Sequence, residues 1–195
     1  MVRPLQWDSM TVTRSEIRHA LSRHLDRHPG EVDDMALLFH ALNEGHDITS
    51  RKEFRIGHVT AGAAVVDLTG RVLMIQHKTL DKWLLPGGHL EPEDTSLLGA
   101  SLRELEEETG IPWQQVVSPP AHGITPVDID IHKIPANPAK DEPEHHHFDI
   151  RYAHRVENTD VQLQLEEVTA FEWCPLAELP SNLAHKLAPV ALSVR

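Results

Sequence analysis

Two segments near the start of the chain place hydrophobic residues at helical spacing. In residues 13–27 and again in residues 31–42, apolar side chains return every three or four positions. The two apolar stripes consist of Ile17, Leu21 and Leu25, and of Met35, Leu38 and Leu42. Pro29 and Gly30 stand between the segments and interrupt a continuous helix. The pattern predicts a helical hairpin within an N-terminal extension, residues 1–50.

From residue 54 onward the pattern changes to short runs rich in β-branched residues, which are typical of strands. The predicted strands cover residues 56–67, 72–76, 83–85, 127–134, 148–156 and 168–173. Residues 135–147, between two of these strands, combine prolines with charged and histidine side chains and predict a surface loop.

Two further helices are expected among these strands. Residues 95–109 show helical periodicity, with Asp94 or Thr95 as the N-cap and Gly110 as the C-terminal stop. Residues 183–192 predict a closing helix. The order β-β-β-α-β-β-β-α predicts the α/β (α+β) class, in which helices cover a mixed sheet.

Composition limits the partners of this chain. Its 195 residues carry a formal net charge of −12, which argues against a nucleic acid polymer because phosphate backbones require clustered Lys and Arg. No apolar run approaches the roughly 20 residues that cross a bilayer, and residues 1–10 lack the apolar core of a secretory signal. Cys174 is the only cysteine, which suits a reducing compartment. We expect a cytoplasmic protein without a membrane or nucleic acid partner.

Three glutamates form an unusual cluster in the predicted helix over residues 95–109. Glu104, Glu107 and Glu108 stand at positions i, i+3 and i+4, which places them on one helix face, and we expect this face to lie opposite the leucines. Like charges at this spacing repel one another, and acidic groups at a helix C-terminus also oppose the macrodipole. A bound Mg²⁺ or Mn²⁺ would turn both terms favourable, because hard cations prefer oxygen ligands.

A glycine pair precedes this helix and completes a longer pattern. The segment from Leu85 to Pro92 contains Gly87 and Gly88, at which backbone can approach a ligand closely. Turn and helix together resemble the Nudix box, which reads Gly, five residues, Glu, seven residues, Arg-Glu, an aliphatic residue, any residue, Glu-Glu, any residue, Gly and an aliphatic residue. The residues that match are Gly88, Arg103, Glu104, Leu105, Glu107, Glu108, Gly110 and Ile111.

The chain departs from this pattern at two points. Asp94 stands in place of the first Glu, and eight residues rather than seven separate it from Arg103. In the family the first Glu helps to brace the box through the Arg. The extra residue is expected to bulge the loop, which puts an Asp94–Arg103 contact in question.

The resemblance implies a Nudix-type α/β/α sandwich over residues 51–195 and a hydrolase of diphosphate linkages in small nucleotide-like molecules. It implies that Glu107 and Glu108 bind Mg²⁺ or Mn²⁺, with Glu104 and the Gly87 carbonyl as further contacts. Water activated by the ion attacks phosphorus. Glu104 is the first choice as general base, and Arg103 braces the catalytic helix. Gly88 and the adjacent His89 are expected to approach the substrate.

The segment 141–147 is the best source of a group from outside the box. His145 and His147 point to one side if this segment is extended, and could contact phosphate or metal. Glu144 is an alternative general base, and all three are candidates for substrate binding. The other interpretation is a solvated polar loop. Two histidines alone would leave Zn²⁺ under-coordinated.

Two other classes of function stay open from the sequence. The altered spacing of the box is compatible with a catalytically weak or inactive Nudix-fold module that senses a ligand. An isopentenyl diphosphate type of isomerase resembles this fold as well, but it would need a catalytic cysteine ahead of the helix, and Cys174 lies far behind it. We hypothesise a homodimer formed through the N-terminal hairpin, because family members often dimerise.

Overall fold

The computed structural model describes residues 11–120 and 122–192. The inference about a signal rested on residues 1–10, which lie outside this range. The predicted N-terminal hairpin is confirmed: helix α1 (Arg14–Arg27) and helix α2 (Ala36–Glu44) flank a short 3₁₀ helix at Pro29–Glu31. Thr13 caps α1 by accepting a hydrogen bond from the backbone N–H of Glu16.

Within the described residues, eight strands form one mixed sheet, which confirms the predicted fold class. They are β1 (His58–Val66), β2 (Arg71–His77), β3 (Lys82–Leu84), β4 (Gly87–His89), β5 (Val116–Val117), β6 (Asp128–Ile134), β7 (His145–Val156) and β8 (Val168–Pro175). The central pair, β1 and β7, is parallel, and all other pairs are antiparallel. β1 is shared along one edge by β2 and β4, so the sheet divides there.

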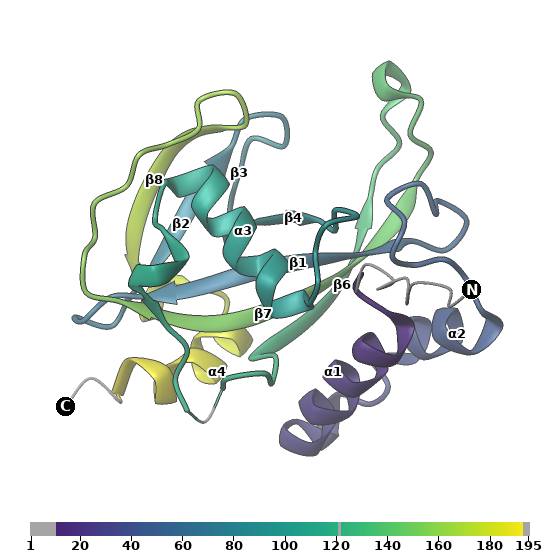
Figure 1. Ribbon diagram of the computed structural model, residues 1–195, viewed down its shortest axis with the longest axis horizontal. Coiled ribbons are helices and arrows are strands. Elements are labelled where there is room, and N and C mark those ends of the chain that lie inside the picture. The colour runs from purple at the N-terminus through teal and green to yellow at the C-terminus, as the bar shows by residue number, and fades with distance from the viewer. Residues whose placement is uncertain (1–10, 121, 193–195) are drawn as a thin grey trace, which may run out of the picture.

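Helices cover both faces of this sheet (Figure 1). Helix α3 (Leu97–Thr109) packs Leu105 against Ala63 and Val65 of β1, and helix α4 (Ser181–Leu192) packs Leu187 near Ala64 on the other face. Successive strand residues point to opposite faces, which explains why neighbours in β1 belong to different clusters. The result is the predicted α/β/α layering.

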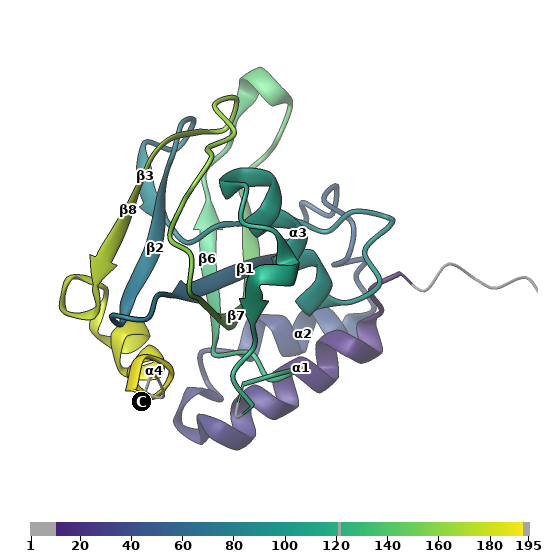
Figure 2. The same cartoon turned by 60° about the vertical axis from the view of Figure 1, so that its left-hand side comes forward.

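The N-terminal helices belong to the same core as the sheet. Figure 2 shows α1 and α2 beside the N-terminal end of α3. Their fully buried side chains, among them Ile17 and Leu38, share a cluster with Leu97 of α3 and Phe148 of β7. The apolar stripes of the hairpin therefore pack against the core of the same chain. Among the described residues, no helix is long and apolar enough to span a membrane.

Three sequence predictions were wrong at their boundaries. The predicted surface loop 135–147 is shorter, because residues 145–147 already belong to β7, which pairs with β1 and β6. The glycine turn contains the strand β4, whose pairing with β1 depends on backbone hydrogen bonds that no side-chain pattern reveals. The second helix begins at Ala36 rather than at residue 31.

Candidate functional site

Helix α3 is held at both ends by specific contacts. Its N-cap is Ser96, not Asp94 or Thr95 as expected, and the Ser96 hydroxyl accepts a hydrogen bond from the N–H of Gly99 at 3.0 Å. Glu16 of α1 accepts another from the N–H of Leu97 at 2.7 Å, so the N-terminal hairpin helps to fix this helix. Gly110 ends the helix with a φ of 68°, a conformation that favours glycine.

Arg103 connects most of the box. Its guanidinium donates to both carboxylate oxygens of Asp94 at 2.9 and 3.0 Å, so the contact that the extra residue put in question is made. The loop absorbs the insertion because Asp94 also accepts from the N–H of Glu91. Arg103 further donates to Glu104, to Glu107 and to the carbonyl of His89. The bidentate geometry fixes the helix against the glycine strand.

Glu104 and Glu108 point toward the glycine strand β4. Glu108 accepts a hydrogen bond from the N–H of Gly87 at 2.9 Å, and its side chain is buried. The carboxylate of Glu104 lies so close to Gly88 that a Cβ there would stand 2.6 Å from its oxygens. A side chain at Gly88 would displace the Glu104 carboxylate, and a Cβ at Gly87 would stand 2.7 Å from the backbone oxygen of Ala61, so packing favours both glycines.

The buried stripe of α3 differs from the one expected. It consists of Leu97, Ala100, Ser101, Leu105, Glu108 and Thr109. Glu104 and Glu108 continue this stripe instead of lying opposite the leucines, whereas Glu107 is 56% exposed and pairs with Arg103. The prediction failed because Gly87 and Gly88 of β4 leave space for carboxylates on the face that packs against the sheet.

Burial and mutual repulsion make the two inner carboxylates weak acids. Burial first, and neighbouring negative charges next, raise the pKa of Glu104 to about 7 and that of Glu108 to about 8, against the opposing effects of Arg103 at Glu104 and of the Gly87 N–H at Glu108. One of these charges belongs to Glu167, in the loop before β8, which the sequence analysis missed. The negative charge of Glu167 thus adds to that of Glu104 and Glu108, which favours a cation.

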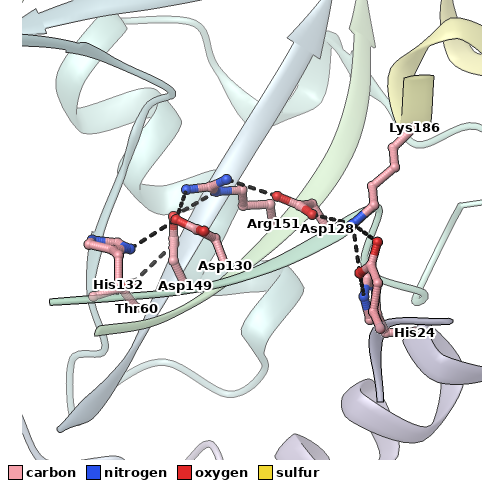
Figure 3. A network of polar contacts seen from close by, with 9 residues as sticks. His24, Thr60, Asp128, Asp130, His132, Asp149, Arg151 and Lys186 are labelled. Atoms are coloured by element: carbon pink, nitrogen blue, oxygen red, sulfur yellow. Dashed lines mark hydrogen bonds and ion pairs between the residues drawn. The ribbon is translucent and has the colours of Figure 1, made fainter. Parts of the chain in front are cut away.

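A polar network covers part of the opposite face of the sheet (Figure 3). Arg151 of β7 donates to Asp128 and Asp130 of β6, and to Asp149, at 2.7 to 2.9 Å. Lys186 of α4 joins Asp128 to Glu31, which also contacts the buried His24. The sequence analysis did not identify this network, because its members are spread over five elements, some of which lie far apart in the sequence.

The network forms part of the lining of a hollow of about 530 Å³. Its walls comprise Glu31, Asp34, Met35, Met74, Trp83, Leu84, Leu85, Asp128, Ile129, Asp130, Ile131, Arg151, Pro180, Asn182 and Leu183. Residues 83–85 run directly into the glycine pair, and Gly62 of β1 lies between Gly87 and the Arg151 side chain. The hollow therefore adjoins the box through a part of the sheet that lacks side chains. Its size is that of a small-molecule pocket.

Histidines gather at the start of β1 and β7. His145 and His147 lie on one side of β7, as predicted, and the structure adds His58 of β1, whose Cα pairs with that of His147. The ring centroid of His89 lies 5.0 Å from that of His58, with the rings tilted, and 5.3 Å from that of His147, with the rings edge to face. Burial first, and neighbouring cationic groups next, lower the pKa of His58 and His89 to about 4 and that of His147 to about 2. The rings of His58, His89 and His147 are therefore neutral at physiological pH.

Glu144, unlike the histidines of this cluster, lies at the protein surface. Its side chain is 55% exposed and lies 2.7 Å from the ammonium of Lys133 on the paired strand.

Comparisons with known proteins find a family and a relative that resemble this chain. The model of the NUDIX domain family matches residues 57–193. A protein of Lactococcus lactis subsp. cremoris named "Probable DHNTP pyrophosphohydrolase" is 33% identical over 120 residues, which cover 62% of this chain and 60% of that protein.

Two solved structures share the fold at 20% identity. A NUDIX hydrolase from Clostridium perfringens has a TM-score of 0.54, with 71% of this chain and 98% of that one covered. An Ap4A hydrolase of C. elegans has a TM-score of 0.53, with 69% and 98% covered.

Proposed function

Since the chain belongs to the NUDIX domain family, we propose that it is a divalent-metal-dependent pyrophosphohydrolase that cleaves a diphosphate linkage in a nucleotide-like molecule. The observation that carries the proposal is the convergence of Glu104, Glu108 and Glu167 beside a glycine pair. Two buried carboxylates with raised pKa values are costly unless a cation or a reaction uses them.

The donor set fits Mg²⁺ or Mn²⁺. Glu104 and Glu108 offer hard oxygen ligands, the Gly87 carbonyl and the half-exposed Glu107 are further candidates, and Glu167 adds charge. When bound, such an ion neutralises phosphate charge and lowers the pKa of a water molecule. Arg103 is occupied by four protein groups, so we assign it a positioning role.

The chain itself supplies orientation and a proton acceptor. We propose that an Oε atom of Glu104 accepts the proton of the attacking water as oxygen bonds to phosphorus and the anhydride P–O bond breaks. A pKa near 7 suits a general base at neutral pH. Glu144 is the less favoured base, because it is exposed and paired with Lys133. Gly88 and His89, next to these groups, would contact the substrate phosphates.

The hollow beside the box supports a heterocyclic substrate. Trp83, 43% exposed, offers an aromatic face, and Asp130, whose side chain is also 43% exposed, offers a carboxylate. Carboxylates recognise amino and imino donors of the kind that pterins and purines carry. Together with the Lactococcus relative, this makes dihydroneopterin triphosphate the first substrate to test.

We propose an assay of the untagged full chain with dihydroneopterin triphosphate, nucleoside triphosphates, dinucleoside polyphosphates, nucleotide sugars and non-nucleotide diphosphates. Pyrophosphate and phosphate release are measured with Mg²⁺, with Mn²⁺ and with chelator. Metal-dependent release of pyrophosphate from a pterin or purine triphosphate is expected. Isotope-labelled water then identifies the attacked phosphorus.

Glu104→Gln should lose turnover, and Glu106→Gln is its control. Glu106 lies on the same helix but accepts a hydrogen bond from the N–H of Trp113, away from the glycine strand. Binding of these compounds without turnover in any metal would contradict the hydrolase and favour a ligand-sensing module. Equal loss in both variants would remove Glu104 from the proposed base role.

A further inference from the structure

The histidine cluster brings three ring nitrogens near enough to converge on one metal ion. One ligand atom from each of His58, His145 and His147 lies within 4.8 Å of the other two. Tetrahedral Zn²⁺ with Zn–N bonds of about 2.0–2.1 Å separates its ligand nitrogens by about 3.3 Å. An inward shift of less than about 1 Å by each ring closes the gap. The sequence alone offered only two of these three histidines.

In two of these rings Nδ1 makes a hydrogen bond to the backbone, so the lone pair on Nε2 is directed away from that bond. His145 Nδ1 lies 2.8 Å from the carbonyl of Pro143, and His58 Nδ1 lies 3.4 Å from the carbonyl of Glu53. A carbonyl only accepts, so each Nδ1 carries the proton and each Nε2 is an acceptor. This arrangement, in which the outer nitrogen donates to the backbone, is the usual one for metal-bound histidine.

The Nε2 atom of His58 has no partner within the described part of the chain. It is fully buried, and the residue is 1% exposed. An unpaired buried acceptor costs free energy of the order of 1–3 kcal/mol, so it calls for an explanation. Phe54 packs on the rings of both His58 and His145 and shields the cluster, which excludes a solvated polar loop as the explanation.

We propose that His58, His145 and His147 bind a first-row transition-metal ion, in the first instance Zn²⁺, at a site separate from the box carboxylates. Imidazole suits Zn²⁺, whereas carboxylates suit Mg²⁺ and Mn²⁺, so the two sites select different ions. Three protein ligands leave a fourth position open for water or another ligand. The ring of His89, which packs on His58 and His147, is the nearest described candidate to face it.

Such an ion would join two strands beside the glycine strand. It would link the start of β1 to the start of β7 and hold both next to His89, whose carbonyl accepts from Arg103 of the box. This assigns His145 and His147 a metal-ligand role in place of the substrate contact expected from the sequence. The inference does not rest on the proposed hydrolase activity.

The test is Zn²⁺ binding by the untagged full chain after treatment with chelator. Calorimetric titration in excess Mg²⁺ should give one equivalent of Zn²⁺, and Co²⁺ should give the intense visible absorption of a four-coordinate nitrogen site. His58→Gln and His147→Gln should each weaken binding at least about a hundredfold. No stoichiometric binding by the folded wild type, or no Co²⁺ spectrum of this kind, overturns the proposal.

His146→Ala is the matched control from the same histidine triplet. Strand alternation points its side chain away from His145 and His147, so Zn²⁺ affinity should be unchanged. Glu108→Gln should also retain Zn²⁺, which separates this site from the box. Equal weakening by His146→Ala and His147→Gln, with all variants folded by circular dichroism, would refute the assignment. Because the readout is metal stoichiometry, its failure is distinct from failure of the hydrolase assay.

Discussion

The carboxylates of the box and the histidines of the neighbouring strands respond in opposite ways to burial. Glu104 and Glu108 sit on one helix, and burial raises their pKa values toward neutrality. His58 and His147 come from two strands, and burial lowers their pKa values well below neutrality. Both regions flank the strand β4.

The difference teaches that burial prepares the two groups for a cation in different ways. A buried histidine becomes a neutral donor that can bind metal without releasing a proton. A buried carboxylate with a raised pKa must lose its proton before it binds a hard cation. The predictions below try to separate the two regions, beginning with the largest expected effect.

Glu108→Gln should lower metal-dependent turnover by about a thousandfold, because metal stabilisation of transition-state charge is worth several kcal/mol. The variant removes a ligand candidate but keeps the shape that accepts the N–H of Gly87. Steady-state kinetics with Mg²⁺ measure it, with Glu106→Gln as the control. Turnover within tenfold of the wild type would remove Glu108 from the proposed metal site.

Arg103→Lys should lower stability by about 2–3 kcal/mol and turnover by about 10- to 100-fold. Lysine cannot reproduce the bidentate contact with Asp94 while it holds Glu104 and the His89 carbonyl. Urea unfolding and kinetics measure both effects. Zn²⁺ affinity should stay within about threefold, since the histidines keep their own contacts. A larger fall in Zn²⁺ affinity would show that the two regions form one unit.

Thermal stability of the metal-free protein should depend on pH with two limbs of different origin. Folded-state pKa values near 7 and 8 exceed the ordinary value of Glu, so stability contributed by Glu104 and Glu108 is full below about pH 4.5 and is lost as pH rises through 7 to 8. The pKa of His58 falls from 6.5 to about 4, so its contribution is full above about pH 6.5 and is lost as pH falls toward 4.

Variants assign each limb. Glu108→Gln should flatten the alkaline limb by a few degrees, and His58→Gln should flatten part of the acid limb, to which the buried His154 also contributes through its lowered pKa. Scanning calorimetry from about pH 4 to pH 9 in chelator measures both. If both variants changed the same limb, burial would not shift the pKa values of the glutamates and of His58 in opposite directions.

Ser96→Ala should destabilise the protein by about 1 kcal/mol, because the N-cap of α3 is lost. Thr95→Ala, at an exposed neighbouring position, is the control and should stay within about 0.5 kcal/mol. Urea unfolding compares the two. A larger loss of stability in Thr95→Ala than in Ser96→Ala would show that Thr95, one of the two residues expected from the sequence, is the N-cap.

The sequence by itself determined the fold class and the carboxylate face. Helical spacing places Glu104, Glu107 and Glu108 close together whatever the rest of the chain does, and the glycine pair precedes them directly. It also indicated that His145 and His147 would share one side if their segment were extended, although it placed both in a surface loop. These relations are local, and local geometry is fixed by backbone periodicity.

Only the tertiary structure decided which distant groups meet. The parallel pairing of β1 with β7 brings His58 to His147. The loop before β8 adds the charge of Glu167 to that of the box. The pairing of β6 with β7 surrounds Arg151 with three aspartates, two from β6 and one from β7. The tertiary structure also decided that Glu104 and Glu108 face the sheet, because β4 has no side chains there. Strand register and interlayer packing depend on contacts across long sequence separations, which periodicity along the chain does not encode.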